Sequence, residues 1–210
     1  MKICVAGLWH LGTVTASCLA QRGHDVIGYD ADVATVSALA EGRPPILEPG
    51  LSELVADGLA SGRLHFTSDA RAALAEADVL WVAYDTPVDD EDRADVDAVA
   101  EHLRRLFGAL AEGTTIIVSS QVLAGTTRRL ADELRSARPG VQFGWAYSPE
   151  NLRLGNAIAA FQQAERIVVG VDDRATRSTL EPLVGPLAAH VEWMSVPSAE
   201  MTKHALNAFL

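Results

Sequence analysis

The chain has 210 residues, of which 49% are hydrophobic and 21% charged, with a net charge of -11 and an isoelectric point near 4.9. This composition is typical of a soluble globular protein with one main domain. An acidic protein repels nucleic-acid backbones and anionic lipids, and no run of eighteen apolar residues predicts a membrane helix, so we expect a cytoplasmic protein without nucleic-acid or membrane partners.

The first 32 residues predict a nucleotide-binding unit. Lys2–Ala6 is an apolar strand, a glycine turn then opens a helix that ends at Arg22-Gly23, and a second apolar strand, Asp25–Tyr29, leads into Asp30. Amides at the N-terminus of such a helix hold a pyrophosphate, and an acid after the second strand accepts both hydroxyls of a ribose. The predicted cofactor contacts in this unit are Gly7, Trp9, His10, Leu11, Gly12, Asp30 and Asp32.

Trp9 stands where the G-x-G-x-x-G pattern has its second glycine. Its bulk should hold a pyrophosphate away from the turn, because an indole replaces the single hydrogen of glycine. Gly7 and Gly12 alone also fit a nucleotide-free sheet in which they serve only chain reversal and packing. Asp30 and Asp32, with no arginine beside them, would repel a 2'-phosphate, so the expected cofactor is NAD and not NADP.

Beyond Asp30 the chain alternates strands and helices without a linker or repeat, which predicts one continuously wound parallel sheet. The fold class is therefore α/β, a doubly wound, mostly parallel Rossmann-like sheet with helices on both faces. The further strands are expected near Leu64–Thr67, Val79–Ala83, Thr115–Ser119, Phe143–Tyr147, Ile167–Val171 and Val191–Met194, and two of the crossover helices at Asp97–Leu110 and Thr126–Ala137.

Cys4 and Cys18 lie among apolar neighbours and are expected to be small buried hydrophobic residues without catalytic or disulfide roles. No metal site is predicted.

The segment after the last predicted strand carries polar residues at helical spacing. Pro197 can open a helix, on which Glu200, Lys203 and Asn207 would share one face. A cation and an amide one turn apart could stabilise an oxyanion, although a solvated Glu-Lys pair fits the spacing as well. Glu150, after Ser-Pro, has the equally plain interpretation of an acid in the first turn of a helix.

Several motifs in order make the chain resemble the UDP-glucose/GDP-mannose dehydrogenase family along its whole length. They are the opening unit, Gly42–Leu51, Thr86-Pro87, Ser148-Pro-Glu150 and Ser198–Leu210. The resemblance implies an NAD-dependent oxidation of the C6 hydroxyl of a nucleotide-linked sugar to a carboxylate in two steps, through a cysteine thioester.

The resemblance also assigns roles to individual residues. It adds Thr86 and Pro87 to the cofactor contacts, makes Glu150 the base for thioester hydrolysis, and gives Lys203 and Asn207 the charged oxygen at C6. Gln121 stands where the family has a threonine that helps to order water in the active site, and an amide can still bind that water. A UDP-sugar is the expected substrate in preference to a GDP-sugar.

The chain departs from the family at several positions. Leu154 replaces a second glutamate, and Tyr84-Asp85 precede Thr-Pro. The family's nucleophilic cysteine and most of its nucleotide-sugar domain would lie beyond Leu210. We therefore expect residues 1–195 to form an NAD-binding domain and 196–210 to begin an interdomain helix, through which the full-length protein forms a homodimer.

Two alternatives to this hypothesis stay open at the level of sequence. The chain could be a free-standing NAD-binding module without chemistry. It could also be a two-electron dehydrogenase of the related hydroxyacid type, which would use the lysine and the asparagine without a cysteine.

Overall fold

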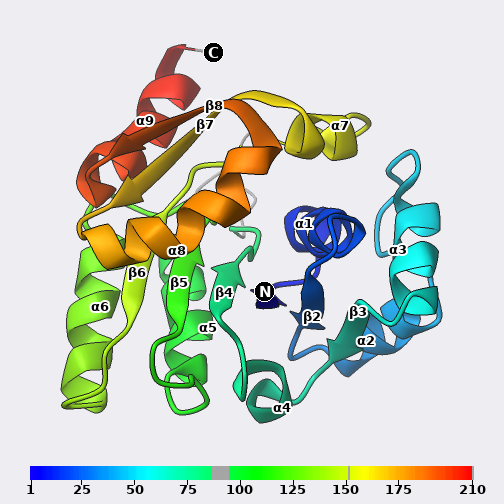
Figure 1. Cartoon of the computed structure of the whole chain (residues 1–210), viewed down its shortest axis with the longest axis horizontal. Coiled ribbons are helices and arrows are strands. Elements are labelled where there is room, and N and C mark those ends of the chain that lie inside the picture. Colours follow the sequence, from blue (N-terminus) through cyan, green and yellow to red (C-terminus); the bar gives the residue numbers. More distant parts are fainter. Residues whose placement is uncertain (87–94, 151, 210) are drawn as a thin grey trace.

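The computed structural model describes residues 1–86, 95–150 and 152–209, without the side chains of residues 96 and 206–209. Within these residues an eight-stranded sheet has the order β3-β2-β1-β4-β5-β6-β7-β8 (Figure 1). The strands are β1 Lys2–Ala6, β2 Asp25–Tyr29, β3 Leu64–Thr67, β4 Val79–Val82, β5 Thr115–Val118, β6 Gly144–Tyr147, β7 Ala164–Val171 and β8 Ala188–Met194. The sheet confirms the predicted doubly wound α/β fold.

Helices connect these strands and cover both faces of the sheet. They are α1 His10–Gln21, α2 Val33–Ala40, α3 Leu51–Ala60, α4 Ala70–Leu74, α5 Val96–Leu106, α6 Thr126–Ala137, α7 Ala157–Gln162, α8 Arg174–Val184, the 3-10 turn η1 Gly185–Leu187, and α9 Val196–Phe209. The predicted helix at Thr126–Ala137 has the observed bounds, and the one predicted from Asp97 to Leu110 ends four residues earlier, at Leu106.

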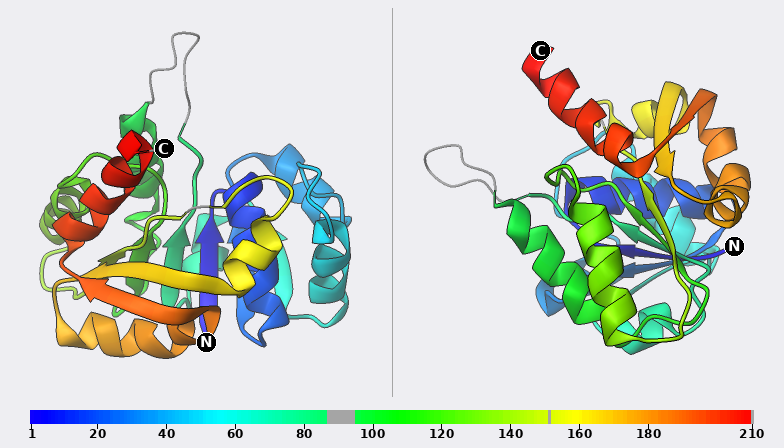
Figure 2. Two further views of the ribbon diagram at one scale, coloured as in Figure 1. Left: turned by 90° about the horizontal axis from the view of Figure 1, so that it is seen from above. Right: turned by 90° about the vertical axis from the view of Figure 1, so that its left-hand side faces the viewer.

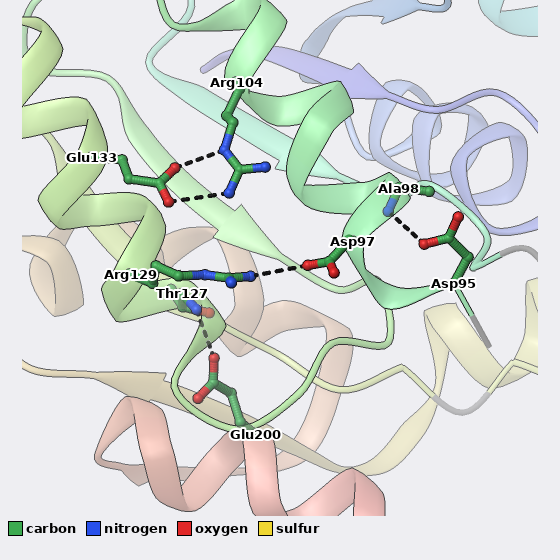
Figure 3. A network of polar contacts seen from close by, with 8 residues as sticks. All are labelled: Asp95, Asp97, Ala98, Arg104, Thr127, Arg129, Glu133 and Glu200. Carbon is green, nitrogen blue, oxygen red and sulfur yellow. Dashed lines mark hydrogen bonds and ion pairs between the residues drawn. The ribbon is translucent and has the colours of Figure 1, made fainter. Parts of the chain in front are cut away.

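Successive side chains of a strand point to opposite faces of the sheet, and both sets are buried where helices cover both faces. One face packs on α5 and α6 through Cys4, Leu80, Val82, Ile116 and Val118. The other packs on α1 and α8 through Ile3, Val5, Val79, Trp81 and Ile117. On the first face, α5 and α6 are also joined by the ion pairs Arg104–Glu133 and Arg129–Asp97 (Figure 3).

The prediction of one continuously parallel sheet is wrong at β7. Strands β1 to β6 pair in parallel, but β6 and β7 are antiparallel, and β7 and β8 are parallel again. A parallel crossover needs a helix that runs back along a face of the sheet. The connection after β6 instead contains only the six-residue α7, so the chain re-enters the sheet from the end at which it left.

The topology gathers the polar segments at one edge of the sheet. The carboxyl ends of β1, β4, β5 and β6 meet there, and α9 begins beside them after β8 (Figure 2). The C-terminal end of α9 points away from the sheet. Among the described helices, none has both the length and the apolarity that crossing a bilayer demands.

Candidate functional site

The β1–α1 turn has the geometry that its two glycines predict. Gly7 has a φ of 94°, in the region that side chains avoid, and its amide donates to Tyr29 O at 3.0 Å. A Cβ on Gly7 would lie 2.7 Å from the backbone of Tyr84, and one on Gly12 would lie 1.6 Å from Gly7 O. Both positions therefore need glycine, because α1 lies against the turn with no room for a methyl group.

The N-terminus of α1 offers unpaired amides. Trp9 is the N-cap residue and makes no side-chain cap, no acid lies in the first turn, and the first intrahelical bond runs from Thr13 N to Trp9 O. The amides of the first turn and the helix dipole thus face outward at the carboxyl edge of the sheet. This arrangement fits the diphosphate of a dinucleotide.

Trp9 is compatible with this turn. Its backbone has a φ of -84°, which any residue adopts, and its side chain is 52% exposed. The φ of Trp9 therefore does not require glycine, and the exposed indole stands at the N-terminus of α1.

Asp30 stands at the end of β2 beside the same turn. Its carboxylate accepts bonds from Leu8 N at 2.8 Å and from Asp32 N at 3.0 Å. Asp32 instead caps α2, with bonds from the amides of Ala34 and Thr35. These hydrogen bonds lower the pKa of Asp32; the bond from the Thr35 hydroxyl has the largest effect and the two amides follow. Both carboxylates are therefore close to the place where a ribose would lie, although Asp32 also has a structural task.

A pocket of about 210 Å³ brings together five of the residues predicted for the site. Leu11, Thr86, Gln121, Glu150 and Lys203 line it, so the pocket draws on α1, α9 and the segments after β4, β5 and β6. The Thr86 hydroxyl donates to Gln121 O at 3.0 Å, which joins two of these segments. The remaining lining residues are Tyr84, Asp85, Ser119 and Ser120.

The pocket concentrates ionisable groups. Asp85, which lines the pocket, has a raised pKa because burial desolvates its carboxyl and, secondarily, because Glu150 lies nearby. Burial also raises the pKa of the Tyr84 phenol, whose ring stacks on His102 with centroids 4.5 Å apart. The Ser120 hydroxyl is buried and makes no hydrogen bond with the described residues.

Glu150 does not occupy the first turn of a helix. It follows β6 in a loop, and its carboxylate accepts the amide of Leu152 at 2.6 Å. The helical interpretation is therefore wrong, because Glu150 has no helical assignment and the next helix, α7, begins only at Ala157.

The interpretation of Glu200 and Lys203 as a solvated ion pair is also wrong. Glu200 is fully buried, and its carboxylate accepts Gly125 N at 2.6 Å and Thr127 N at 2.9 Å, at the N-terminus of α6. Figure 3 shows the bond from Thr127. Lys203 Nζ donates to Glu150 O at 2.8 Å. The two side chains thus bind different segments, because each faces a different loop at the edge of the sheet.

An adjoining cavity of about 650 Å³ shares Leu11, Ser119 and Glu150 with the pocket. It extends from there between α1, α7, β7 and β8, with Trp81 and Phe161 in its walls. Trp81 Nε1 donates to the Ser119 hydroxyl at 3.0 Å, which fixes the indole beside the pocket.

The burial predicted for both cysteines is confirmed. Cys4 and Cys18 are free thiols with no exposed surface. Burial raises the pKa of both, that of Cys18 to about 12, so neither thiol can serve as a ready nucleophile.

Two predicted residues cannot be placed in the site. Pro87 lies outside the described residues, and Asn207 lies on α9 with its side chain outside the description. Sequence reasoning also gave no role to Glu48, which is buried and bonded to the amides of Gly155 and Ala157. Its only signal was its place in the Gly42–Leu51 motif, because no periodicity reveals a long-range contact of a loop residue.

Comparison with known proteins gives three consistent matches. The family model described as "UDP-glucose/GDP-mannose dehydrogenase family, NAD binding domain" matches residues 1–187. The UDP-glucose 6-dehydrogenase of Rhizobium meliloti is 37% identical over 216 residues, which cover 100% of this chain and 49% of that protein. The GDP-mannose 6-dehydrogenase of Azotobacter vinelandii is 33% identical over 216 residues, with 100% and 50% covered.

A solved structure agrees with these sequence matches. The crystal structure of a ternary complex of GDP-mannose dehydrogenase from Pseudomonas aeruginosa has a TM-score of 0.91 at 33% identity, and the match covers 100% of this chain and 50% of that one. The chain thus spans about half the length of each of these relatives.

Proposed function

The chain belongs to the UDP-glucose/GDP-mannose dehydrogenase family as its NAD-binding domain, and we propose that the whole protein is a nucleotide-sugar 6-dehydrogenase. One observation carries the proposal. Lys203, on α9, and Glu150, after β6, line one pocket at the carboxyl edge of the sheet, next to the turn that fits a dinucleotide. A dehydrogenase needs this juxtaposition of a cofactor site with groups that handle charge at the reacting carbon.

The chain's own residues would hold NAD at three places. The outward amides of the first turn of α1 receive the diphosphate, Asp30 accepts the ribose hydroxyls, and Thr86 with Leu11 lines the way into the pocket. When bound, NAD supplies the hydride acceptor.

Lys203 and Glu150 have different tasks in the proposed reaction. The Lys203 ammonium stabilises negative charge on the oxygen at C6, aided by Asn207 one turn further along α9. Glu150 is the base that activates water for hydrolysis, and Gln121 in the same pocket orients that water. The direct Lys203 Nζ to Glu150 O bond keeps the cation beside the base while leaving the Glu150 carboxylate to other partners.

A four-electron oxidation through a thioester needs a thiolate, which these 210 residues do not provide. Cys4 and Cys18 are buried in β1 and α1, away from the pocket. The proposed nucleophile is therefore a cysteine of a further domain that covers the pocket and excludes water.

We propose a UDP-sugar as the substrate. The support is the higher sequence identity to a UDP-sugar enzyme: the UDP-glucose 6-dehydrogenase of R. meliloti is 37% identical to the chain and the GDP-mannose 6-dehydrogenase of A. vinelandii 33%. We also propose that the full-length protein is a homodimer that pairs through α9, on which Met201 is 51% exposed. Turnover with UDP-glucose against GDP-mannose, and the mass in solution, test these two points.

The cofactor site is tested by calorimetric titration of the 210-residue chain. NAD should bind more tightly than NADP, because Asp30 and Asp32 repel a 2'-phosphate. Equal or tighter binding of NADP would contradict the assigned site. The 210-residue chain alone should not reduce NAD in the presence of a nucleotide sugar, since the pocket is then without the further domain that we propose covers it and excludes water.

The catalytic roles are tested in the longer protein, with substitutions in the chain's only two lysines, Lys2 and Lys203, as a matched pair. Lys203→Ala should slow the first oxidation on the order of a hundredfold, as loss of an oxyanion donor does. Lys2→Ala should not, because Lys2 pairs with Glu76 at the opposite edge of the sheet.

Glu150→Gln should spare thioester formation and slow its hydrolysis, so a covalent adduct accumulates and is seen by intact mass. Full turnover of Glu150→Gln would refute the role of the base.

A further inference from the structure

Glu48 brings three distant segments of the chain to one buried carboxylate. It comes from the loop before α3, and its side chain is 1% exposed. Its two oxygens accept Gly155 N at 2.7 Å, just before α7, and Ala157 N at 2.8 Å, at the first residue of α7. The same carboxylate lies 3.4 Å from Nε2 of His10, the first residue of α1.

The electrostatics favour an ionised Glu48 at this junction. Burial on its own would raise the pKa of the carboxyl, but the two amide hydrogen bonds and His10 outweigh burial, and the pKa lies below its ordinary value. A buried carboxylate with both oxygens bonded holds its partners strongly, because any movement that breaks these bonds leaves the charge desolvated and unpaired. The Glu150-to-α7 segment is thus held to the loop that precedes α3.

His10 links this junction to the cofactor turn. It belongs to the same helix turn whose amides fit the diphosphate, and its Nε2 is buried without a hydrogen bond among the described residues. A modest shift of the first turn of α1 toward a bound diphosphate would change the 3.4 Å contact between His10 and Glu48. A change at Glu48 is in turn transmitted to Gly155 and Ala157, which lie five and seven residues after Glu150.

We propose that Glu48 and His10 are positioning residues that couple occupation of the dinucleotide site to the conformation of the segment carrying Glu150. The proposal rests on the proposed function, because it takes the β1–α1 turn as the cofactor site. It gives the Gly42–Leu51 motif a physical role. The motif supplies the Glu48 carboxylate, which contacts His10 at the start of α1 and binds the amides of Gly155 and Ala157 after Glu150. Coupling of this kind between sites amounts to a roughly 5- to 150-fold change in affinity.

The test is hydrogen exchange of the 210-residue chain with and without saturating NAD, together with calorimetry. In the unmodified chain, NAD should slow exchange of the amides of residues 152–157. His10→Phe keeps a ring of similar size but has no N–H, and it should lose that NAD-dependent slowing. His10→Gln restores a donor that can reach Glu48 and should regain it.

The variant Glu48→Gln tests the other partner of the contact between His10 and Glu48. It should speed exchange at residues 155 and 157 in the free chain and weaken NAD binding at least about fivefold. Asp173→Asn is the matched control, because Asp173 also accepts an amide and a hydroxyl at a helix start, both from Thr176 in α8, and these bonds involve neither α1 nor α7. Its NAD affinity and its exchange at 152–157 should match the unmodified chain.

The outcomes separate this proposal from the proposed function. If the unmodified chain does not bind NAD, the function fails. If NAD binds but His10→Phe retains the slowing at 152–157, or Glu48→Gln binds NAD as tightly as Asp173→Asn does, the coupling is refuted while the cofactor site stands.

Discussion

Replacement of Gly12 by alanine tests the close packing of α1 against the β1–α1 turn. The added Cβ would stand 1.6 Å from Gly7 O, against an ordinary contact of 3.4–4 Å, so the two must separate by roughly 1.8 Å or more. No flexible side chain can yield, because the obstacle is backbone, and Gly7 is itself wedged against the backbone of Tyr84. The helix must lift from the turn, which exposes apolar surface and moves the amides that face the diphosphate.

Overpacking of this kind costs about 1–3 kcal/mol and occasionally more, and the rigid backbone obstacle puts Gly12→Ala at about 3 kcal/mol. For a chain of this size that loss lowers the unfolding temperature by roughly 6–12 °C. The control is Gly185→Ala, where the backbone is helical, with a φ of -54°, and nothing lies within 4 Å of the new methyl group. It should stabilise the fold by about 0.4–1 kcal/mol through the unfolded state.

Urea unfolding followed by circular dichroism measures both variants, and calorimetry measures their NAD affinity. Gly12→Ala should lose stability and NAD binding together, whereas Gly185→Ala should keep its affinity. If Gly12→Ala unfolds within about 0.5 kcal/mol of the unmodified chain, α1 does not pack on the turn as described and the reasoning about the diphosphate site is wrong.

Three further predictions concern Trp9, the cysteines and one ion pair. Trp9→Gly should tighten NAD binding in calorimetry by removing the indole from the path of the diphosphate, and unchanged or weaker binding would show that the indole contacts the cofactor favourably. Cys4 and Cys18 should react with a thiol reagent at pH 8 only after denaturation, since at a pKa of about 12 roughly one Cys18 thiol in ten thousand is ionised, and fast labelling of the native chain would contradict their burial. The hydrogen bond from Arg104 lowers the pKa of Glu133, so the pair stabilises the fold above the unfolded-state pKa of about 4.3 and loses this contribution as the pH falls through the depressed value. Glu133→Gln should therefore lose roughly 0.5 kcal/mol at pH 7 and nothing near pH 2, and a loss that persists at pH 2 would point to packing instead.

The central strands could be predicted from the sequence because they are short apolar runs, such as β4 and β5, in which every residue is buried. Val79–Val82, with all four residues buried, shows the pattern most clearly. The direction of β7 could not be predicted, because a strand's composition is the same whichever way it runs. Direction depends on the connection, and α7 is too short to carry the chain back along the sheet.

The site was predictable where chemistry depends on local spacing and not where it depends on distant contacts. The turn of Gly7 and Gly12 follows from the spacing, because Gly7 has a positive φ and Gly12 lies against Gly7 O, five residues earlier in the chain. Glu48 and Glu200 could not be recognised as buried, since acids are exposed by default and the amides that bind them lie 107 and 75 positions away, at Gly155 and Gly125.

The burial of Glu200 explains the position of Lys203, the residue that we propose as the catalytic cation. A buried carboxylate is tolerated only with full hydrogen bonding, so α9 can dock only in the position where Glu200 meets the amides of Gly125 and Thr127. Residues three and four positions further along then lie on the same face of the helix. They reach the neighbouring loops: Lys203 bonds Glu150 O, and His204 Nε2 lies 3.0 Å from Val122 O. Glu200 thus fixes the position of α9, and α9 fixes the position of Lys203. The positive charge of Lys203 therefore lies beside the pocket before any substrate binds, as electrostatic preorganisation requires.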